Sequence, residues 1–115
     1  MNIAIGSDER THVTDAVMDE LRRRGHALLP AGPLIEQEDL RGLGRPLRSE
    51  QSWPAVARAV AEAVTSGAAD EGILFCWTGT GVSMAANKVP GIRAALCDDA
   101  EPARGARLWN NANVL

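Results

Sequence analysis

A cysteine stands where a short apolar run meets a glycine-rich segment. The run Gly72–Phe75 leads directly into Cys76, and Gly79 and Gly81 follow shortly after. Glycines at such a junction allow a sharp turn and bring backbone N–H groups close to a ligand, at a helix start that carries partial positive charge. The pattern favours a site for an anion, or for an oxygen that becomes one. The alternative is a buried structural cysteine beside a turn that needs glycine only for its geometry.

The glycine segment matches neither of two common nucleotide-binding motifs. It lacks the third glycine of the dinucleotide fingerprint, and Lys88 comes too late to form the Gly-Lys-Ser/Thr ending of the phosphate-binding loop. The two cysteines and two histidines of the chain lack the Cys-x-x-Cys spacing of a structural zinc site. We therefore expect no cofactor and no metal ion. A reducing cytosol also disfavours a disulfide between the two cysteines.

The composition is that of an ordinary soluble domain. A length of 115 residues, a hydrophobic content of 45% and a formal net charge of −3 allow one domain with its own core. The mild acidity argues against general nucleic-acid binding, which needs unopposed Lys and Arg. No apolar run approaches the roughly 20 residues that span a bilayer, and the first residues lack the basic region of a signal peptide. We therefore expect a cytoplasmic protein that binds neither nucleic acid nor membrane.

Strand and helix patterns alternate along the chain. Short apolar runs predict strands at residues 3–5, 27–29, 72–76, 92–97 and 113–115. Apolar residues at helical spacing predict helices at residues 13–24, 53–66, 80–88 and 102–108, with N-caps at Ser52 and at Asp98 or Asp99. The polar stretch 34–51 shows no clean period and is predicted to be a long loop.

This alternation predicts an α/β fold. We expect one Rossmann-like domain over residues 1–115, a three-layer sandwich whose parallel sheet has five strands, or four and a truncated fifth. Ligands of such sheets bind beyond the carboxyl ends of the strands. Asp8, Cys76 and Asp98 each follow a predicted strand, and residues 109–113 precede the last one. We expect these carboxylate, thiol and amide groups to meet in one crevice.

Several segments match a known family in the same order along the chain. The matching segments are 3–8 (IAIGSD), 72–76 (GILFC), 78–81 (TGTG), 85–94 (AANKVPGIRA) and 110–114 (NNANV). With them the chain resembles the type B ribose-5-phosphate isomerases, whose family includes the galactose-6-phosphate isomerase subunits. The resemblance covers nearly the whole chain, and residues 72–97 are its most specific part.

The resemblance implies a proton-transfer site at Cys76. In the family, the matching cysteine is the base that moves a proton between C1 and C2 of an open-chain sugar phosphate, through a cis-enediolate. The amides of a glycine loop favour the thiolate form of such a cysteine. Together with the Thr78 hydroxyl, they could also hold the enediolate oxygen. The substrate contacts that the resemblance implies are Asp8, Glu9, Gly79, Thr80, Gly81 and Asn110.

The chain departs from the family at several aromatic and charged positions. Glu9 replaces a histidine that helps to hold the phosphate, and His12, one helical turn later, is a candidate substitute. Trp109 replaces the histidine that opens the sugar ring, and an indole cannot act as a general acid. Trp53 replaces a tyrosine, and Trp77 replaces a small residue after the cysteine. These last two side chains are expected to narrow or fill the pocket.

The matching segments do not explain how a phosphate is held. Family members continue beyond the position of Leu115 into a last helix whose arginines reach a phosphate. Either the chain is truncated relative to the natural protein, so that this domain lacks that helix, or another element compensates for it. Arg41, Arg45 and Arg48 of the predicted loop are candidate replacements. The alternative for these three arginines is a solvated loop without a binding role.

The residues leave three functions open. The first is a divergent aldose–ketose isomerase of a pentose phosphate or an open-chain tetrose phosphate. A tetrose 4-phosphate cannot close a furanose ring, because the phosphate occupies the hydroxyl that ring closure needs. The second is a catalytically impaired relative that binds a sugar phosphate or complements a paralogous subunit. The third is a different reaction, with Cys76 as nucleophile or Asp8 and Glu9 as an acid and base pair. A homodimer or homotetramer is expected, because the sheet edge needs a cover and family members place their sites between subunits.

Overall fold

The computed structural model describes residues 1–36 and 51–115, in which strands and helices alternate as the sequence predicts. The elements are β1 (Asn2–Ser7), α1 (His12–Arg23), β2 (Ala27–Ala31), the short 3-10 helix η1 (Gly32–Leu34), α3 (Trp53–Thr65), β3 (Glu71–Phe75), α4 (Thr80–Ala86) and α5 (Ala100–Asn110). None of these described helices is long and apolar enough to cross a membrane. The predicted loop arginines Arg41, Arg45 and Arg48 lie outside the described residues.

The sheet is parallel, with the strand order β2-β1-β3. Val114 continues it as an isolated parallel bridge to Gly72 of β3 on one side and to Ala94 on the other. The α/β fold with a parallel sheet is therefore confirmed. The predicted fourth and fifth strands appear among the described residues only as these bridges. On the edge away from Val114, both backbone groups of Ala94 bond to the side chain of Asn87.

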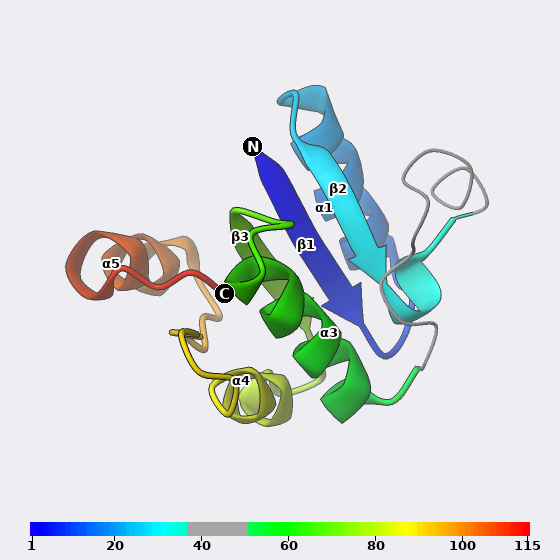
Figure 1. Cartoon of the computed structure of the whole chain (residues 1–115). Helices are drawn as coiled ribbons and strands as arrows, with labels where there is room; N and C mark the ends of the chain where they lie inside the picture. The colour runs from blue at the N-terminus through cyan, green and yellow to red at the C-terminus, as the bar shows by residue number, and fades with distance from the viewer. Residues whose placement is uncertain (37–50) are drawn as a thin grey trace.

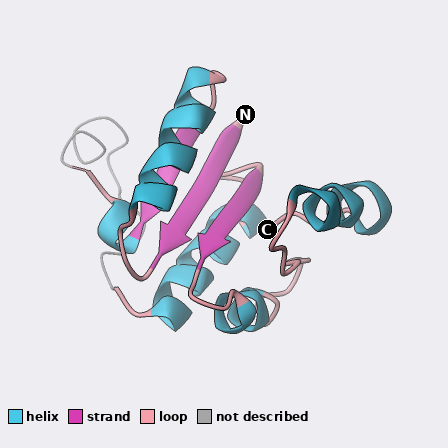
Figure 2. Ribbon diagram, turned by 180° about the vertical axis from the view of Figure 1, so that it is seen from behind, coloured by secondary structure: helices cyan, strands magenta, loops and turns pink. Residues whose placement is uncertain are grey.

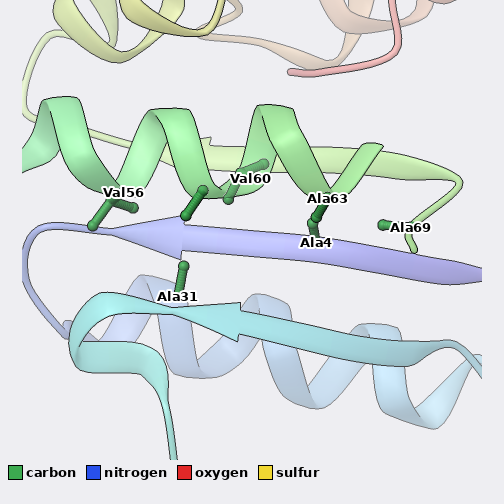
Figure 3. Packing of buried hydrophobic residues seen from close by; sticks show 7 residues of the cluster. Ala4, Ala31, Val56, Val60, Ala63 and Ala69 are labelled. Carbon is green, nitrogen blue, oxygen red and sulfur yellow. The ribbon is translucent and has the colours of Figure 1, made fainter. Parts of the chain in front are cut away.

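Helices cover both faces of the sheet (Figures 1 and 2), because alternate residues of β1 point to opposite sides. Ile3 and Ile5 face α1 and pack in the same cluster as Met18. Ala4 faces α3 and packs in a cluster with Val60 (Figure 3). All five side chains are buried. The central strand thus supplies core residues to both layers, which fixes its ends relative to α1 and α3.

The helix starts follow the sequence signals. Thr11 caps α1 and exchanges hydrogen bonds with Thr14, which forms a capping box. Asp99 caps α5 by accepting from the Glu101 N–H at 3.0 Å. Ser52 occupies the N-cap of α3 without a side-chain hydrogen bond. These positions agree with the prediction of caps at Ser52 and at the aspartate pair.

Strand β2 is longer than predicted, because Pro30 lies inside it and pairs with Ile5 of β1. The sequence analysis took Pro30 as the end of the strand. Among the described strands β2 is at the edge of the sheet, and an edge strand tolerates a residue without an N–H.

Helix α5 lies beside the sheet rather than on one of its faces (Figure 2). Its Arg107 donates to the carboxylate of Glu71, at the start of β3, and to the carbonyl oxygen of Ala112. Leu108 and Trp109 are 64% and 77% exposed, so the end of this helix presents a large apolar surface. The salt bridge between Arg107 and Glu71 ties α5 to the amino-terminal end of β3.

Candidate active site

Two cavities open at the carboxyl end of β3, and Phe75, Cys76 and Trp77 line both. The first, here called the loop cavity, has a volume of about 240 Å³. It is formed by residues 74–79, Val82, Ser83, residues 94–98 and the last two residues of the chain. The second, here called the carboxylate cavity, has a volume of about 230 Å³. It is formed by residues 7–9, Thr11, Val13, Thr14 and residues 75–77.

The turn after Cys76 requires a glycine at position 79. Gly79 is the N-cap of α4 and has a left-handed backbone with φ of 72°. A Cβ added at this position would overlap the Cδ1 atom of Leu96. The left-handed conformation disfavours any other residue, and a side chain here would also have to displace the end of the Leu96 side chain. The predicted role of this glycine in a sharp turn therefore agrees with the structure.

The Thr78 hydroxyl lies at the edge of the loop cavity. Its oxygen accepts a weak hydrogen bond from the Thr80 N–H, at 3.4 Å. Since a hydroxyl also carries one donor, Thr78 can still donate to an oxygen of a bound molecule. Thr80 itself is exposed and lines neither cavity.

Gly81 also lines neither cavity, because the indole of Trp53 covers it. Ring carbons of Trp53 lie 3.1–3.3 Å from the point where a Cβ of Gly81 would stand. The sequence analysis expected Trp53 to narrow the pocket and Gly81 to contact substrate. Instead, the two residues contact each other outside the cavity walls, since Trp53 begins α3 and faces the first turn of α4.

Asp8 holds an unused acceptor beside Cys76. Its Oδ1 atom is buried and has no hydrogen-bond partner in the described part of the chain. Asp8 lines the carboxylate cavity, as does Glu9, whose N–H donates to the Ser7 hydroxyl at 3.2 Å. Buried polar atoms in native proteins are almost always paired, so an unpaired one beside a cavity marks a place for a ligand hydroxyl or a water.

A second thiol, Cys97, lines the loop cavity opposite the glycine turn. Burial, and to a smaller degree the charge of Asp98, raises the pKa of the Cys97 thiol. Its Sγ atom contacts the carbonyl oxygen of Ala95 at 3.6 Å. Both cysteines are free. The sequence analysis did not choose Cys97 as a site residue, although its position at the end of a predicted strand placed it at the same edge of the sheet as Cys76.

The lining side chains are acidic where they are charged. Asp8, Glu9 and Asp98 line the two cavities, and no Lys, Arg or His does so within residues 1–36 and 51–115. His12 lies instead in a groove on the outer side of α1, with Leu21 and other residues of that helix. The candidate phosphate contact at His12 is therefore not part of either cavity. The described residues also contain no group of three or more side chains that could hold a metal ion.

Asn110 and Trp109 lie at the wrong end of the sheet to join this site within one chain. Both are exposed on α5 and line neither cavity. Val114 pairs with Gly72, near the start of β3, so residues preceding Val114 approach the amino-terminal edge of the parallel sheet. Cys76 follows the carboxyl end of β3. The expected convergence with Cys76 was wrong, because residues that precede a parallel strand and residues that follow one lie at opposite edges.

Trp77 stands between the two cavities and is 88% exposed. It does not fill either of them, contrary to the expectation from its size. Its indole borders both openings, since it follows Cys76 directly. A large apolar side chain in this position can contact whatever enters from solvent.

Comparisons with known proteins show which family the chain resembles. The family model described as Ribose/Galactose Isomerase matches residues 3–115. The chain aligns over its whole length with the D-erythrulose-4-phosphate isomerase of Pectobacterium atrosepticum, at 34% identity and with 69% of that protein covered. A stretch of 63 residues, 55% of this chain, is 52% identical to the galactose-6-phosphate isomerase subunit LacB of Clostridium acetobutylicum.

Among solved structures, the ribose-5-phosphate isomerase B of Clostridium thermocellum is similar with a TM-score of 0.79 and 39% identity. The alignment covers 100% of this chain and 70% of that one. The match to LacB spans 36% of that protein, so the chain covers well under two thirds of this relative's length.

Proposed function

Because the chain belongs to the ribose/galactose isomerase family, we propose that it interconverts the aldose and ketose forms of a small sugar phosphate, with Cys76 as the base. One observation carries the proposal: Cys76 is shared by a cavity with an unpaired carboxylate oxygen and a cavity walled by a glycine turn. The cavity with the unpaired carboxylate oxygen suits a sugar hydroxyl. The cavity walled by the glycine turn suits an oxygen that gains negative charge.

The proposed reaction moves one proton between neighbouring carbons. The thiolate of Cys76 takes the proton from C2 of the open-chain aldose, and the electrons of that C–H bond form the C1–C2 double bond of an enediolate. The same thiol then returns the proton to C1, while the proton of the C2 hydroxyl passes to the oxygen at C1. The N–H groups of the glycine turn and the Thr78 hydroxyl stabilise the oxygen charge, a contribution of about 2.7–4 kcal/mol for a well-placed donor.

Asp8 is proposed to orient the substrate during this transfer. Its buried Oδ1 atom accepts a hydrogen bond from a sugar hydroxyl, which fills the acceptor that residues 1–36 and 51–115 leave unpaired. A hydrogen bond to a charged group contributes about 1.5–3 kcal/mol. Since Asp8 lies on the opposite side of Cys76 from the glycine turn, the two contacts together fix the reacting carbons beside the thiol.

An open-chain tetrose phosphate is the proposed substrate class. Trp109 stands where the family has its ring-opening histidine, and a substrate that cannot close a furanose ring does not need that acid. A D-erythrulose-4-phosphate isomerase and a ribose-5-phosphate isomerase B both align with the whole of this chain, so the choice of a tetrose phosphate rests on Trp109. The phosphate contacts are proposed to come from Arg41, Arg45 and Arg48. Replacing all three by alanine should weaken phosphate binding, and unchanged affinity would remove this part of the proposal.

A second copy of the chain is proposed to complete the site. Asn110 matches a substrate-binding asparagine of the family but lines neither cavity of its own chain. The exposed end of α5, with Leu108 and Trp109, offers the apolar surface that a partner would cover. In a homodimer or homotetramer, Asn110 of one copy would reach the cavities of the other.

Proton exchange at C2 in heavy water tests the activity directly. Wild-type protein should exchange this proton in a tetrose 4-phosphate faster than in a pentose 5-phosphate, as followed by NMR. Cys76→Ser should slow the exchange by about 10²–10⁴-fold, the usual contribution of a positioned base. The Cys97→Ser variant is the matched control, with the same change in the neighbouring thiol, and should retain exchange. If no tetrose or pentose phosphate exchanges, and Cys76→Ser changes nothing, the isomerase proposal is wrong.

The second candidate is a subunit that binds a sugar phosphate without catalysing its isomerisation alone. It is favoured by the similarity to LacB, named as a subunit, and by the acidic Glu9 in the carboxylate cavity. In that case the purified chain would bind a sugar phosphate in calorimetry but show no C2 exchange. Adding an intact paralogous chain would then restore exchange above the level of the paralogue alone.

A further inference from the structure

We propose that Asn87 is a positioning residue for the glycine turn, and that it acts through residues 94–96 on Gly79. The kinetic part of this inference rests on the proposed function, whereas its structural part does not. Asn87 lies at the C-terminal end of α4, and Gly79 at its N-terminal end. The two ends of this short helix are therefore held by the same stretch of chain.

The contact at the C-terminal end is a two-way hydrogen bond. Asn87 Nδ2 donates to the carbonyl oxygen of Ala94 at 2.9 Å, and Asn87 Oδ1 accepts from the N–H of Ala94 at 2.8 Å. Residues 94–96 also pair with the end of the chain, because the Ala95 N–H donates to the Val114 carbonyl oxygen at 3.0 Å. The amide side chain thus takes the place of a neighbouring strand and fixes the distance between α4 and the segment.

The contact at the N-terminal end is made by Leu96. Its Cδ1 atom occupies the space where Gly79 would carry a Cβ. Leu96 is 53% exposed, so burial in the core does not set its position. Its position follows from the backbone at Ala94, two residues earlier, which Asn87 holds. Through this path the Asn87 amide keeps Leu96 against the left-handed turn that follows Cys76.

Asn113 provides a matched control for Asn87. Its Oδ1 atom accepts from the Arg93 N–H at 2.8 Å, and its Nδ2 group donates to the Gly91 carbonyl at 3.0 Å. Like Asn87, it bonds one backbone donor and one backbone acceptor with its side chain. It does so at Gly91 and Arg93, whereas Asn87 bonds to Ala94. Asn87→Ala and Asn113→Ala therefore remove the same number and kind of hydrogen bonds.

Hydrogen exchange tests the structural part without any assay of activity. In Asn87→Ala, the backbone amides of residues 77–82 should exchange several-fold faster than in the wild type. In Asn113→Ala, exchange in this stretch should stay at the wild-type rate, under conditions in which the two variants are equally stable. Equal acceleration in both variants, or none in Asn87→Ala, would overturn the inference even if the protein proved to have no isomerase activity.

Kinetics test the catalytic part. A shift of about 1 Å in the groups that contact a transition state can cost about 10²-fold in rate. We expect Asn87→Ala to lower kcat by tenfold to a hundredfold with little change in KM, and Asn113→Ala to leave kcat within about twofold. Leu96→Ala should also lower kcat, and the double variant should be no worse than Asn87→Ala, because both act on one turn. Additive losses in the double variant would contradict the path through Leu96. Absence of activity in the wild type would instead refute the proposed function.

Discussion

The two cavities beside Cys76 have similar volumes but different linings. The carboxylate cavity carries Asp8 and Glu9 on a segment that leads into α1, and one of its acceptor atoms has no partner among the described residues. The loop cavity is walled by a left-handed turn and by residues 94–98, most of which are apolar. The carboxylate cavity can therefore accept a hydrogen bond from a ligand, and the Thr78 hydroxyl of the loop cavity can donate one.

Under the proposed function, this difference would let one cysteine serve both halves of a proton transfer. A sugar must be held by its hydroxyls, which need acceptors, while its reacting oxygen gains negative charge and needs donors. Placing both kinds of group on one wall would pair them with each other and leave neither for the substrate. The two sides are kept apart because they follow different strands, β1 and β3, which are neighbours in the sheet.

Changing the glycine turn should have the largest effect on this comparison. Gly79→Ala forces a non-glycine residue into the left-handed region and against Leu96, so kcat should fall by about 10²–10³-fold, as when an oxyanion donor is lost. The unfolding free energy should fall by about 1–3 kcal/mol. In urea unfolding, the double variant Gly79→Ala/Leu96→Ala should regain the part of the unfolding free energy that the overlap with Leu96 costs. It should not regain the part that the left-handed backbone costs. Full recovery would show that the left-handed conformation is not needed.

Neutralising the opposite side should have the next largest effect. Asp8→Asn should weaken substrate affinity by about tenfold to a hundredfold, because a hydrogen bond to a charged group is lost. Stability should change little, because the buried Oδ1 atom has no hydrogen-bond partner in the described part of the chain that the substitution could remove. Glu9→Gln is the control, with the same chemical change at an exposed side chain of the same cavity. An equal loss of affinity in Glu9→Gln would mean that the cavity acts only through its total charge.

Trp77 lies between the two cavities, and removing its indole should join their openings. We expect Trp77→Gly to raise kcat/KM for a pentose 5-phosphate relative to a tetrose 4-phosphate by about tenfold, since pocket size usually contributes 10–200-fold to discrimination. The unfolding free energy should change by less than about 0.5 kcal/mol, because the side chain is 88% exposed. An unchanged ratio between the two substrates would show that the indole does not limit substrate length.

The smallest effect is expected from Cys97, on the wall of the loop cavity. Burial raises the pKa of its thiol, so at alkaline pH the unfolded chain loses this proton while the folded protein still keeps it. The unfolded state then binds fewer protons, and the unfolding free energy falls as the pH rises above the ordinary thiol pKa. Urea unfolding between pH 7 and about 10 should show a shallower decline for Cys97→Ala than for the wild type. Parallel curves would contradict this assignment.

The sequence predicted the parts of the site that depend on local order along the chain. The apolar run before Cys76 and the glycines after it predict a strand, a turn and a helix, and these are found with Gly79 in the left-handed conformation. Asp8 was placed beside Cys76 because both follow neighbouring parallel strands, and both line the carboxylate cavity. Such inferences succeed because strand polarity and turn geometry are properties of short segments.

The positions of three tryptophans and Asn110 were not predictable in this way. Trp53 covers Gly81, Trp77 is exposed, and Trp109 and Asn110 line neither cavity. Side-chain size alone suggested that the indoles fill the pocket, but where a side chain lies depends on how α3, α4 and α5 pack. The register between Val114 and Gly72 placed Asn110 toward the opposite edge of the sheet.

The sequence by itself therefore determined the order of elements, the parallel sheet and the cysteine at the end of β3, because apolar periodicity and glycine positions encode them locally. Only the tertiary structure decided that two separate cavities meet at this cysteine, that Leu96 lies against Gly79, and that Asn87 takes the place of a strand beside Ala94. These features join residues that are distant in the chain, and their contacts depend on register and packing that no local pattern specifies.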